Sequence, residues 1–141
     1  MKLEKLAFGL VVKAEPHHSI RKVAGLMSAR NVGSVVITAR NKVLGIVTDR
    51  DIAGWVAGGG KSADSTHIGE IMTKFPLVAS VDDELEPTLD KMAKKGVHRI
   101  PIITRKGDVA GVLSTDDALV LVSRYLADIA AIVEKPRGKK K

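Results

Sequence analysis

The sequence predicts an α/β (α+β) fold in which two pseudosymmetric β-α-β-β-α repeats pack through their sheets. Three observations support this expectation: a motif returns about 65 residues along the chain, apolar runs follow the same order in both halves, and turn residues separate them. The stretches VGSVVI (32–37) and GIVTDRD (45–51) return as VHRIPI (97–102) and GVLSTDD (111–117). The second copy is one residue longer between its two stretches, which places the insertion in a turn.

Composition narrows the class of protein further. Of the 141 residues, 45% are hydrophobic and only 3% are aromatic, so the core must be aliphatic. The chain has no cysteine, which excludes disulfides and thiolate metal sites. It has no apolar run long enough to span a membrane, and its lysine-containing start does not resemble a signal peptide. We therefore expect a cytoplasmic protein without a membrane association.

The elements of the first half follow from hydrophobic spacing and from helix caps. In order, they are a strand at 10–14, a helix capped by Ser19, a hairpin with strands at 35–37 and 43–47, and a helix from Thr48 to the glycines at 58–60. The polar stretch 61–67 that follows is expected to be a linker. The first repeat is thus assigned to residues 1–60.

The second half repeats the same order over residues 68–132. Its expected elements are a helical lead-in at 68–73, a strand at 77–79, a helix capped by Asp82 or Asp83 with Pro87 in its first turn, strands at 100–103 and 109–113, and a helix from Ser114 or Thr115 to about Ile132. The basic residues 133–141 that remain are expected to form a disordered tail. Neither half alone would cover both faces of its sheet, so the two halves should bury their sheets against one another.

Both halves place a hydroxyl residue and an aspartate where a strand turns into a helix. Thr48 is followed by Asp51, and Ser114 is followed by Asp117. The N–H groups of a helix start can seat a phosphate, and an aspartate one turn in can accept hydrogen bonds from ribose hydroxyls. Each copy taken alone is equally a capping box, which stabilises a helix without a ligand. The repetition in matching context favours a ligand site.

These motifs resemble those of a CBS-domain pair, also called a Bateman module. The resemblance covers residues 8–130 and rests on 45–52, 71–73, 97–101 and 111–118. It implies clefts between the repeats that bind AMP, ADP, ATP or S-adenosylmethionine. The aspartates matching Asp51 and Asp117 would hold the ribose, and the hydroxyls of Thr48 and Ser114 would approach the phosphate. Asp116 belongs to the same motif. Strand residues would line the base pocket: Val12, Val35, Val36, Ile37, Val78, Ile100, Pro101 and Ile102.

Cations beside the second strand sharpen this interpretation. His98 and Arg99 are similar to a phosphate-contacting pair in nucleotide-sensing members of the family, and arginine is suited to phosphate. Arg50 is a further phosphate candidate. The first repeat has Gly33 and Ser34 at the matching place, so we expect two unequal clefts. A surface ion pair of Arg99 and a half-buried His98 remain the alternative.

The sequence therefore predicts a regulatory module that binds an adenine nucleotide, with AMP first, and that is not an enzyme. The resemblance implies a homodimer, and the effector would be a separate protein. No cofactor or metal is expected, because the histidines lack ligand spacing. Two alternatives stay open: an S-adenosylmethionine-binding module, and a nucleic-acid-associated protein. The second is suggested by the net charge of +7, five charges of which lie in residues 135–141.

Overall fold

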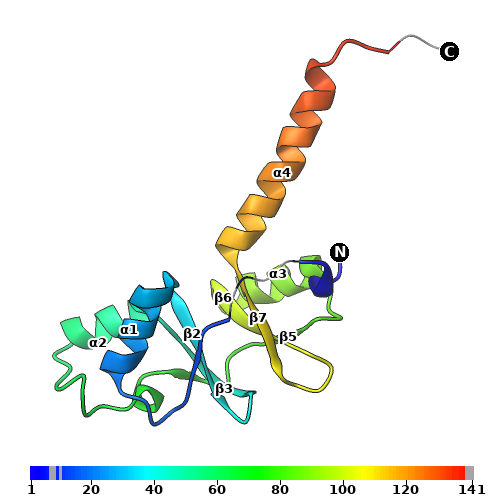
Figure 1. Ribbon diagram of the computed structural model, residues 1–141. Helices are drawn as coiled ribbons and strands as arrows, with labels where there is room; N and C mark the ends of the chain where they lie inside the picture. The colour runs from blue at the N-terminus through cyan, green and yellow to red at the C-terminus, as the bar shows by residue number, and fades with distance from the viewer. Residues whose placement is uncertain (7–8, 10, 139–141) are drawn as a thin grey trace.

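The computed structural model describes residues 1–6, 9 and 11–138, and it confirms the predicted fold class (Figure 1). The first half contains η1 (Leu3–Lys5), β1 (Lys13–Ala14), α1 (Ile20–Arg30), β2 (Ser34–Ala39), β3 (Lys42–Thr48) and α2 (Asp49–Ala57). The second contains η2 (Ile68–Glu70), β4 (Thr73–Lys74), β5 (Ala79–Ser80), α3 (Leu85–Lys95), β6 (Arg99–Ile103), β7 (Val109–Ser114) and α4 (Thr115–Glu134). The β-α-β-β-α order thus occurs twice.

The two sheets repeat one topology. One sheet has the order β1-β2-β3-β4 and the other β5-β6-β7. In each, a short first strand runs parallel to the next, which pairs with its successor as an antiparallel hairpin. Each hairpin even has a register shift at the same place, between Ile37 and Thr38 and between Ile102 and Ile103. The sequence repeat is therefore a structural repeat.

Each half has its own aliphatic core, and the opposite face of each sheet is also covered. Val35 and Ile37 lie in the first core, so strand alternation turns Val36 to the other face, where it is also fully buried. The second sheet behaves alike, with Ile100 and Ile102 in its core and a buried Pro101 between them. Since β3 and β6 are also in contact, the halves pack through their sheets as expected.

Contacts between the two hairpin turns join the halves at a second place. The Nζ of Lys42 lies 2.7 Å from the carboxylate of Asp108 and donates to the carbonyl of Lys106 at 2.6 Å. The backbone N–H of Val109 donates to the carbonyl of Asn41 at 3.1 Å. The two turns therefore hold one another with main-chain as well as charged contacts.

Two segments that the sequence assigned to one half pack on the other half. Leu3 is 0% exposed and belongs to the second core, and Figure 1 shows the N-terminus beside α3. Ile68 lies in the first core, and β4 adds to the edge of the first sheet by pairing with β3. Residues expected in one repeat thus complete the other.

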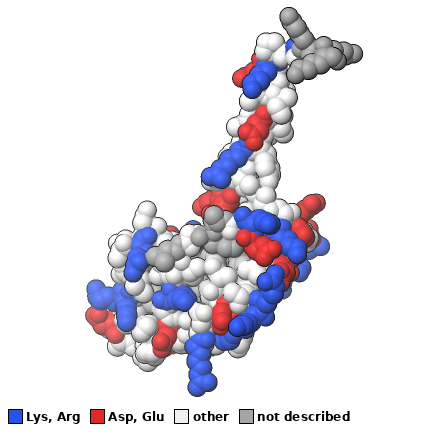
Figure 2. Space-filling view, turned by 45° about the vertical axis from the view of Figure 1, so that its right-hand side comes forward, with Lys and Arg blue, Asp and Glu red and all other residues white. Residues whose placement is uncertain are grey.

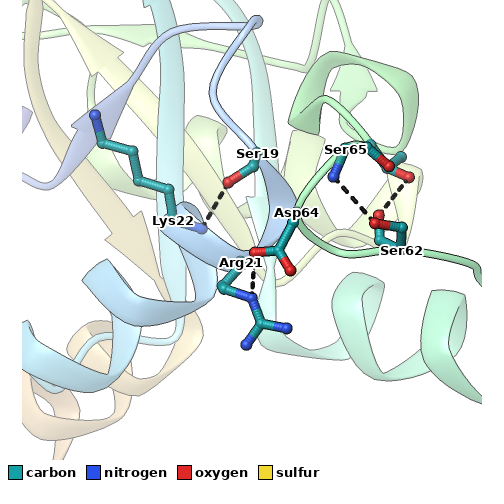
Figure 3. Close-up of polar contacts among 7 residues, drawn as sticks. Ser19, Arg21, Lys22, Ser62, Asp64 and Ser65 are labelled. Carbon is teal, nitrogen blue, oxygen red and sulfur yellow. Dashed lines mark hydrogen bonds and ion pairs between the residues drawn. The ribbon is translucent and has the colours of Figure 1, made fainter.

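The expected linker is docked rather than free along its length. The Arg21 guanidinium forms an ion pair with Asp64 (Figure 3). In addition, the backbone N–H groups of Ile20 and Arg21 donate to the carbonyls of Thr66 and Ala63. Ser19 caps α1 as expected, since its hydroxyl accepts from the N–H of Lys22 at 3.1 Å (Figure 3). The linker therefore covers the first turn of α1.

Several expected boundaries differ from the structure. The helix expected from Asp82 or Asp83 has Glu84 as its N-cap, because Asp83 accepts from the N–H of Ser80 in the preceding turn. The expected strand at 77–79 is β5 at Ala79–Ser80, and the first strand is only Lys13–Ala14, with Leu10 outside the described residues. In the expected tail at 133–141, α4 continues through Glu134, and residues 139–141 lie outside the described residues.

The last helix projects from the body of the molecule (Figure 1). It has 20 residues, and its surface is largely free of charge (Figure 2). Its large apolar side chains are exposed, among them Leu119 at 67% and Leu126 at 61%. Nonetheless, none of the helices in the described part of the chain is long and apolar enough to cross a membrane.

Candidate functional site: two clefts between the halves

Two clefts lie between the halves, and each combines a helix start from one half with a strand start from the other. The α2 cleft, of about 540 Å³, brings the start of α2 together with the residues that lead into β5 and β6. Its lining residues are Ile46, Thr48, Asp49, Arg50, Asp51, Thr73, Pro76, Leu77, 96–100, Thr115 and Asp116. The α4 cleft, of about 330 Å³, brings the start of α4 together with residues that lead into β1 and β2. Its lining residues are Gly9, Val11, Val12, 31–34, Arg99, Val112, Ser114, Asp116 and Asp117.

Both helix starts are complete capping boxes. The hydroxyl of Thr48 accepts from the N–H of Asp51 at 3.1 Å, and the N–H of Thr48 donates to Oδ2 of Asp51 at 2.8 Å. Ser114 and Asp117 form the same pair of hydrogen bonds, both at 3.1 Å, and the Ser114 hydroxyl also lies 2.9 Å from Oδ2 of Asp117. The structural interpretation of the motif is therefore confirmed in both halves.

Capping leaves half of each carboxylate available to a ligand. In Asp51 and in Asp117 the box uses Oδ2, and no donor within the described residues approaches Oδ1. A carboxylate oxygen accepts more than one hydrogen bond, so Oδ1 can receive ribose hydroxyls while Oδ2 stays in the box. Capping and ligand binding are thus compatible in one residue.

The backbone at the start of α2 is less open to a phosphate than the sequence suggested. The N–H of Asp49 donates to the carbonyl of Gly33 at 3.0 Å, and that of Arg50 donates to Oδ1 of Asp49 at 2.8 Å. The third N–H, of Asp51, is the one capped by Thr48. Since all three N–H groups have protein partners, a phosphate in this cleft would have to be bound by side chains.

The expected cations converge on the α2 cleft. Arg50 and His98 line it, and within the described part of the chain neither side chain has an ion-pair partner. Arg99 borders both clefts. Its Nη1 donates to the carbonyl of Gly33 at 3.1 Å and lies 3.7 Å from Oδ1 of Asp49, with the side chain 28% exposed. Arg99 therefore forms its ion pair with Asp49 between the two halves and not on the outer surface.

The strand residues expected to line a base pocket divide into two groups. Val12 borders the α4 cleft and Ile100 the α2 cleft. The others are not among the cleft residues: Val35, Val36, Ile37, Pro101 and Ile102 are buried in the sheets, and Val78 is 37% exposed outside both clefts. The cleft walls come instead from residues just before the strands, such as Leu77 and Val97. Leu77 and Val97 each stand just before a strand of the repeat, and this position is the signal in the sequence that could have identified them as cleft residues.

The remaining histidines lie away from the clefts. His18 accepts from the N–H of Glu15 at its Nδ1 (3.0 Å). Burial, followed by the charges of Lys22 and His17, lowers the pKa of His18 below its ordinary value of 6.5. Among the described residues, no cluster of three or more potential metal ligands is found.

The fold and the paired clefts define a module of two similar repeats with ligand-sized cavities between them. The sequence pattern of the CBS domain matches residues 11–58 and 68–124, so the chain belongs to the CBS domain family and contains a pair of these domains.

Proteins of similar sequence support this assignment. The chain is 33% identical over 129 residues to a 17.7 kDa protein of Acidianus ambivalens, covering 91% of this chain and 74% of that one. It is 28% identical over 126 residues to protein MK0525 of Methanopyrus kandleri, covering 89% of this chain and 64% of that one. The chain thus spans less than two thirds of the length of the Methanopyrus protein.

Solved structures of CBS proteins share the fold. The CBS domain pair of protein MJ0100, in complex with 5′-methylthioadenosine and S-adenosyl-L-methionine, has a TM-score of 0.79 at 24% identity and covers 89% of this chain and 98% of its own. Protein PAE2072 of Pyrobaculum aerophilum, complexed with AMP, has a TM-score of 0.76 at 24% identity, with coverage of 83% and 89%. Adenosine compounds are the ligands named for both structures.

Proposed function

We propose that this chain is a regulatory module that binds an adenine nucleotide, AMP first, and signals its occupancy to a separate effector protein. The observation that carries the proposal is the repeated carboxylate at Asp51 and Asp117, each of which lines a cleft between the halves and uses only Oδ2 in its capping box. The adenosine ligands of two structures of the same fold support this class of ligand.

The clefts offer complementary groups to each part of a nucleotide. Oδ1 of the aspartate would accept from the vicinal ribose hydroxyls, and the hydroxyl of Thr48 or Ser114 lies one hydrogen bond away. Apolar side chains would hold the flat base in each cleft. They are Ile46, Leu77, Val97 and Ile100 in the α2 cleft, and Val11, Val12, Val32 and Val112 in the α4 cleft.

We infer binding and not catalysis because the polar groups of the clefts serve recognition. One oxygen of each aspartate is already used in a capping box, where it accepts a hydrogen bond from the backbone. Regulation would then follow from linkage: a ligand that prefers one arrangement of the halves shifts the population toward it.

Isothermal titration calorimetry with AMP, ADP, ATP and S-adenosylmethionine tests the ligand class. The proposal predicts that AMP binds and that changing both Asp51→Asn and Asp117→Asn weakens binding by about 10- to 100-fold, as expected for hydrogen bonds to a charged group. Asparagine keeps an oxygen for the capping box, so the fold is retained. Asp128→Asn on exposed α4 is the matched control. Tightest binding of S-adenosylmethionine would favour the alternative module.

A second copy of the chain is the partner that α4 fits best. Its apolar residues Leu119, Val122, Leu126, Ile129 and Val133 recur at alternating spacings of three and four, which is the repeat of a two-helix coiled coil. The flanking positions are uncharged, so two copies would meet without like-charge repulsion. We therefore propose a homodimer through α4. Sedimentation should give a dimer that Leu126→Glu converts to a monomer, and a monomeric wild type would contradict it.

Association with nucleic acid through residues 135–141 is the second candidate function, supported by the concentration of charge there. It predicts binding that weakens steeply with salt and is lost when the chain ends at Glu134. Binding that survives this truncation would place the contacts on the folded body.

A further inference from the structure

The two clefts differ most clearly at one pair of matching positions. Arg50 and Asp116 are each the second residue of their helix, α2 and α4. Arg50 borders the α2 cleft alone, whereas Asp116 borders both clefts. The α2 cleft therefore has at this position a cation that the α4 cleft lacks, while the carboxylate of Asp116 borders both clefts.

A second difference concerns the start of the central strands. Arg99 pairs with Ser114 in the second sheet as Ser34 pairs with Thr48 in the first, so Arg99 and Ser34 are counterparts. Likewise, the carbonyls of His98 and Gly33 accept from the first N–H of α4 and α2. The α2 cleft thus has a histidine and an arginine where the α4 cleft has Gly33 and Ser34.

The one cation that the α4 cleft shares is already engaged. Arg99 donates to the carbonyl of Gly33 and faces Asp49. It can approach Gly33 so closely because glycine has no side chain: a Cβ there would lie 2.8 Å from Nη2 and 3.2 Å from Cζ of Arg99. No other lysine or arginine is among the residues described as lining this cleft.

We propose that the two clefts take different classes of adenosine compound. The α2 cleft takes a phosphorylated nucleotide, whose phosphate meets the side chains of Arg50 and His98, which have no ion-pair partner among the described residues, with Arg99 beside them. The α4 cleft takes a nucleoside without a phosphate, uncharged or cationic at its 5′ end, because it contains Asp116 and Asp117 and has no counterpart of Arg50 or His98 among its described lining residues. This assignment rests on the proposed function, since it presupposes that both clefts bind adenosine compounds.

Titration of the full chain with AMP and with 5′-methylthioadenosine tests this assignment. AMP is expected to bind once per chain, and 5′-methylthioadenosine is expected to bind the AMP-saturated protein once more. Arg50→Gln should weaken AMP by about tenfold or more, since it removes a charged partner of the phosphate, and should leave 5′-methylthioadenosine unchanged. Arg50 has no ion pair to lose within the described residues, so its variant should fold. Arg124→Gln on exposed α4 is the matched control.

Variants of the two aspartates assign each ligand to its cleft. Asp51→Asn should weaken AMP selectively, and Asp117→Asn should weaken 5′-methylthioadenosine selectively. AMP binding twice per chain with equal affinity, or an exchange of the two effects, would overturn the assignment while leaving the proposed function intact. A wild-type chain that binds neither compound would overturn both.

Discussion

Shortening Leu3 to alanine tests whether the first residues of the chain are part of the second half. Leu3 is 0% exposed and packs in the second core with Ala79, Met92, Ile100, Ile102 and Leu113. The backbone reinforces this position, since the N–H groups of Leu3 and Glu4 donate to the carbonyls of Asp83 and Val81, both at 2.9 Å. A segment of six residues therefore supplies a core leucine to a domain that begins more than 60 positions later.

The expected loss of stability follows from the burial. A buried Leu→Ala change costs about 2–5 kcal/mol, which combines the lost transfer free energy with the cavity left behind. Leu3 lies in the short segment η1, which can relax into part of the cavity, so we expect the lower part of this range, about 2–3 kcal/mol. For a chain of this length that corresponds to a drop in Tm of about 6–15 °C.

Urea denaturation followed by circular dichroism measures the free energy of unfolding of Leu3→Ala. Val56→Ala is the control, because Val56 is 60% exposed on α2 and its truncation should change stability by less than about 0.5 kcal/mol. If Leu3→Ala is as stable as this control, the N-terminal segment does not complete the second core. A loss of the full size with an unchanged m-value would show that the change lowers stability without altering the surface exposed on unfolding.

Three further perturbations have expected outcomes. Gly45→Ala should lower the free energy of unfolding in urea by about 1–3 kcal/mol, because its Cβ would lie 2.8 Å from the carbonyl of Thr73. Gly54→Ala, whose Cβ would meet open space, should not lower it, and equal effects of the two changes would refute the explanation. Asp108→Ala should lower the free energy of unfolding by less than about 1 kcal/mol, since the ion pair of Asp108 with Lys42 is exposed, and a larger loss would contradict this. Because the pKa of His18 is lowered in the folded state, protonation opposes folding, so stability should fall as pH drops below 6.5; an equal fall in His18→Asn would exclude this cause.

Local signals in the sequence were sufficient for most of the fold. Ser19 caps α1, the glycines at 58–60 end α2, and the β-branched runs form the hairpins because each feature depends on residues close in the chain. The docking of Leu3 on the second half and the pairing of β4 with β3 depend on contacts between distant residues. Such short edge segments have no periodicity of their own, which explains why the sequence did not predict them.

The repeated motif predicted which helix starts border the clefts, but not how the clefts are assembled. Thr48, Asp51, Ser114 and Asp117 border the clefts where the motif placed them. The repeat alone could not show that each helix start faces the strand start of the other half. Each helix start could lie beside the strand start of either half, and the sequence does not distinguish the two arrangements. Hence His98 of the second half lies with Asp51 and not with Asp117, and Arg99 borders both clefts.

Under the proposed function, the position of α4 would link ligand occupancy to the surface that we assign to a second copy. The helix begins at the α4 cleft, with Asp117 in its first turn, and its 20 residues extend about 30 Å away from the body. A ligand whose ribose binds to Asp117 would therefore stabilise one end of a helix whose far end carries exposed apolar side chains. Since Oδ2 of Asp117 caps the helix and Oδ1 would receive the ribose, one residue would join the ligand to the start of the helix. Under the proposed function, a change at this end would then reach a partner through the orientation of the helix.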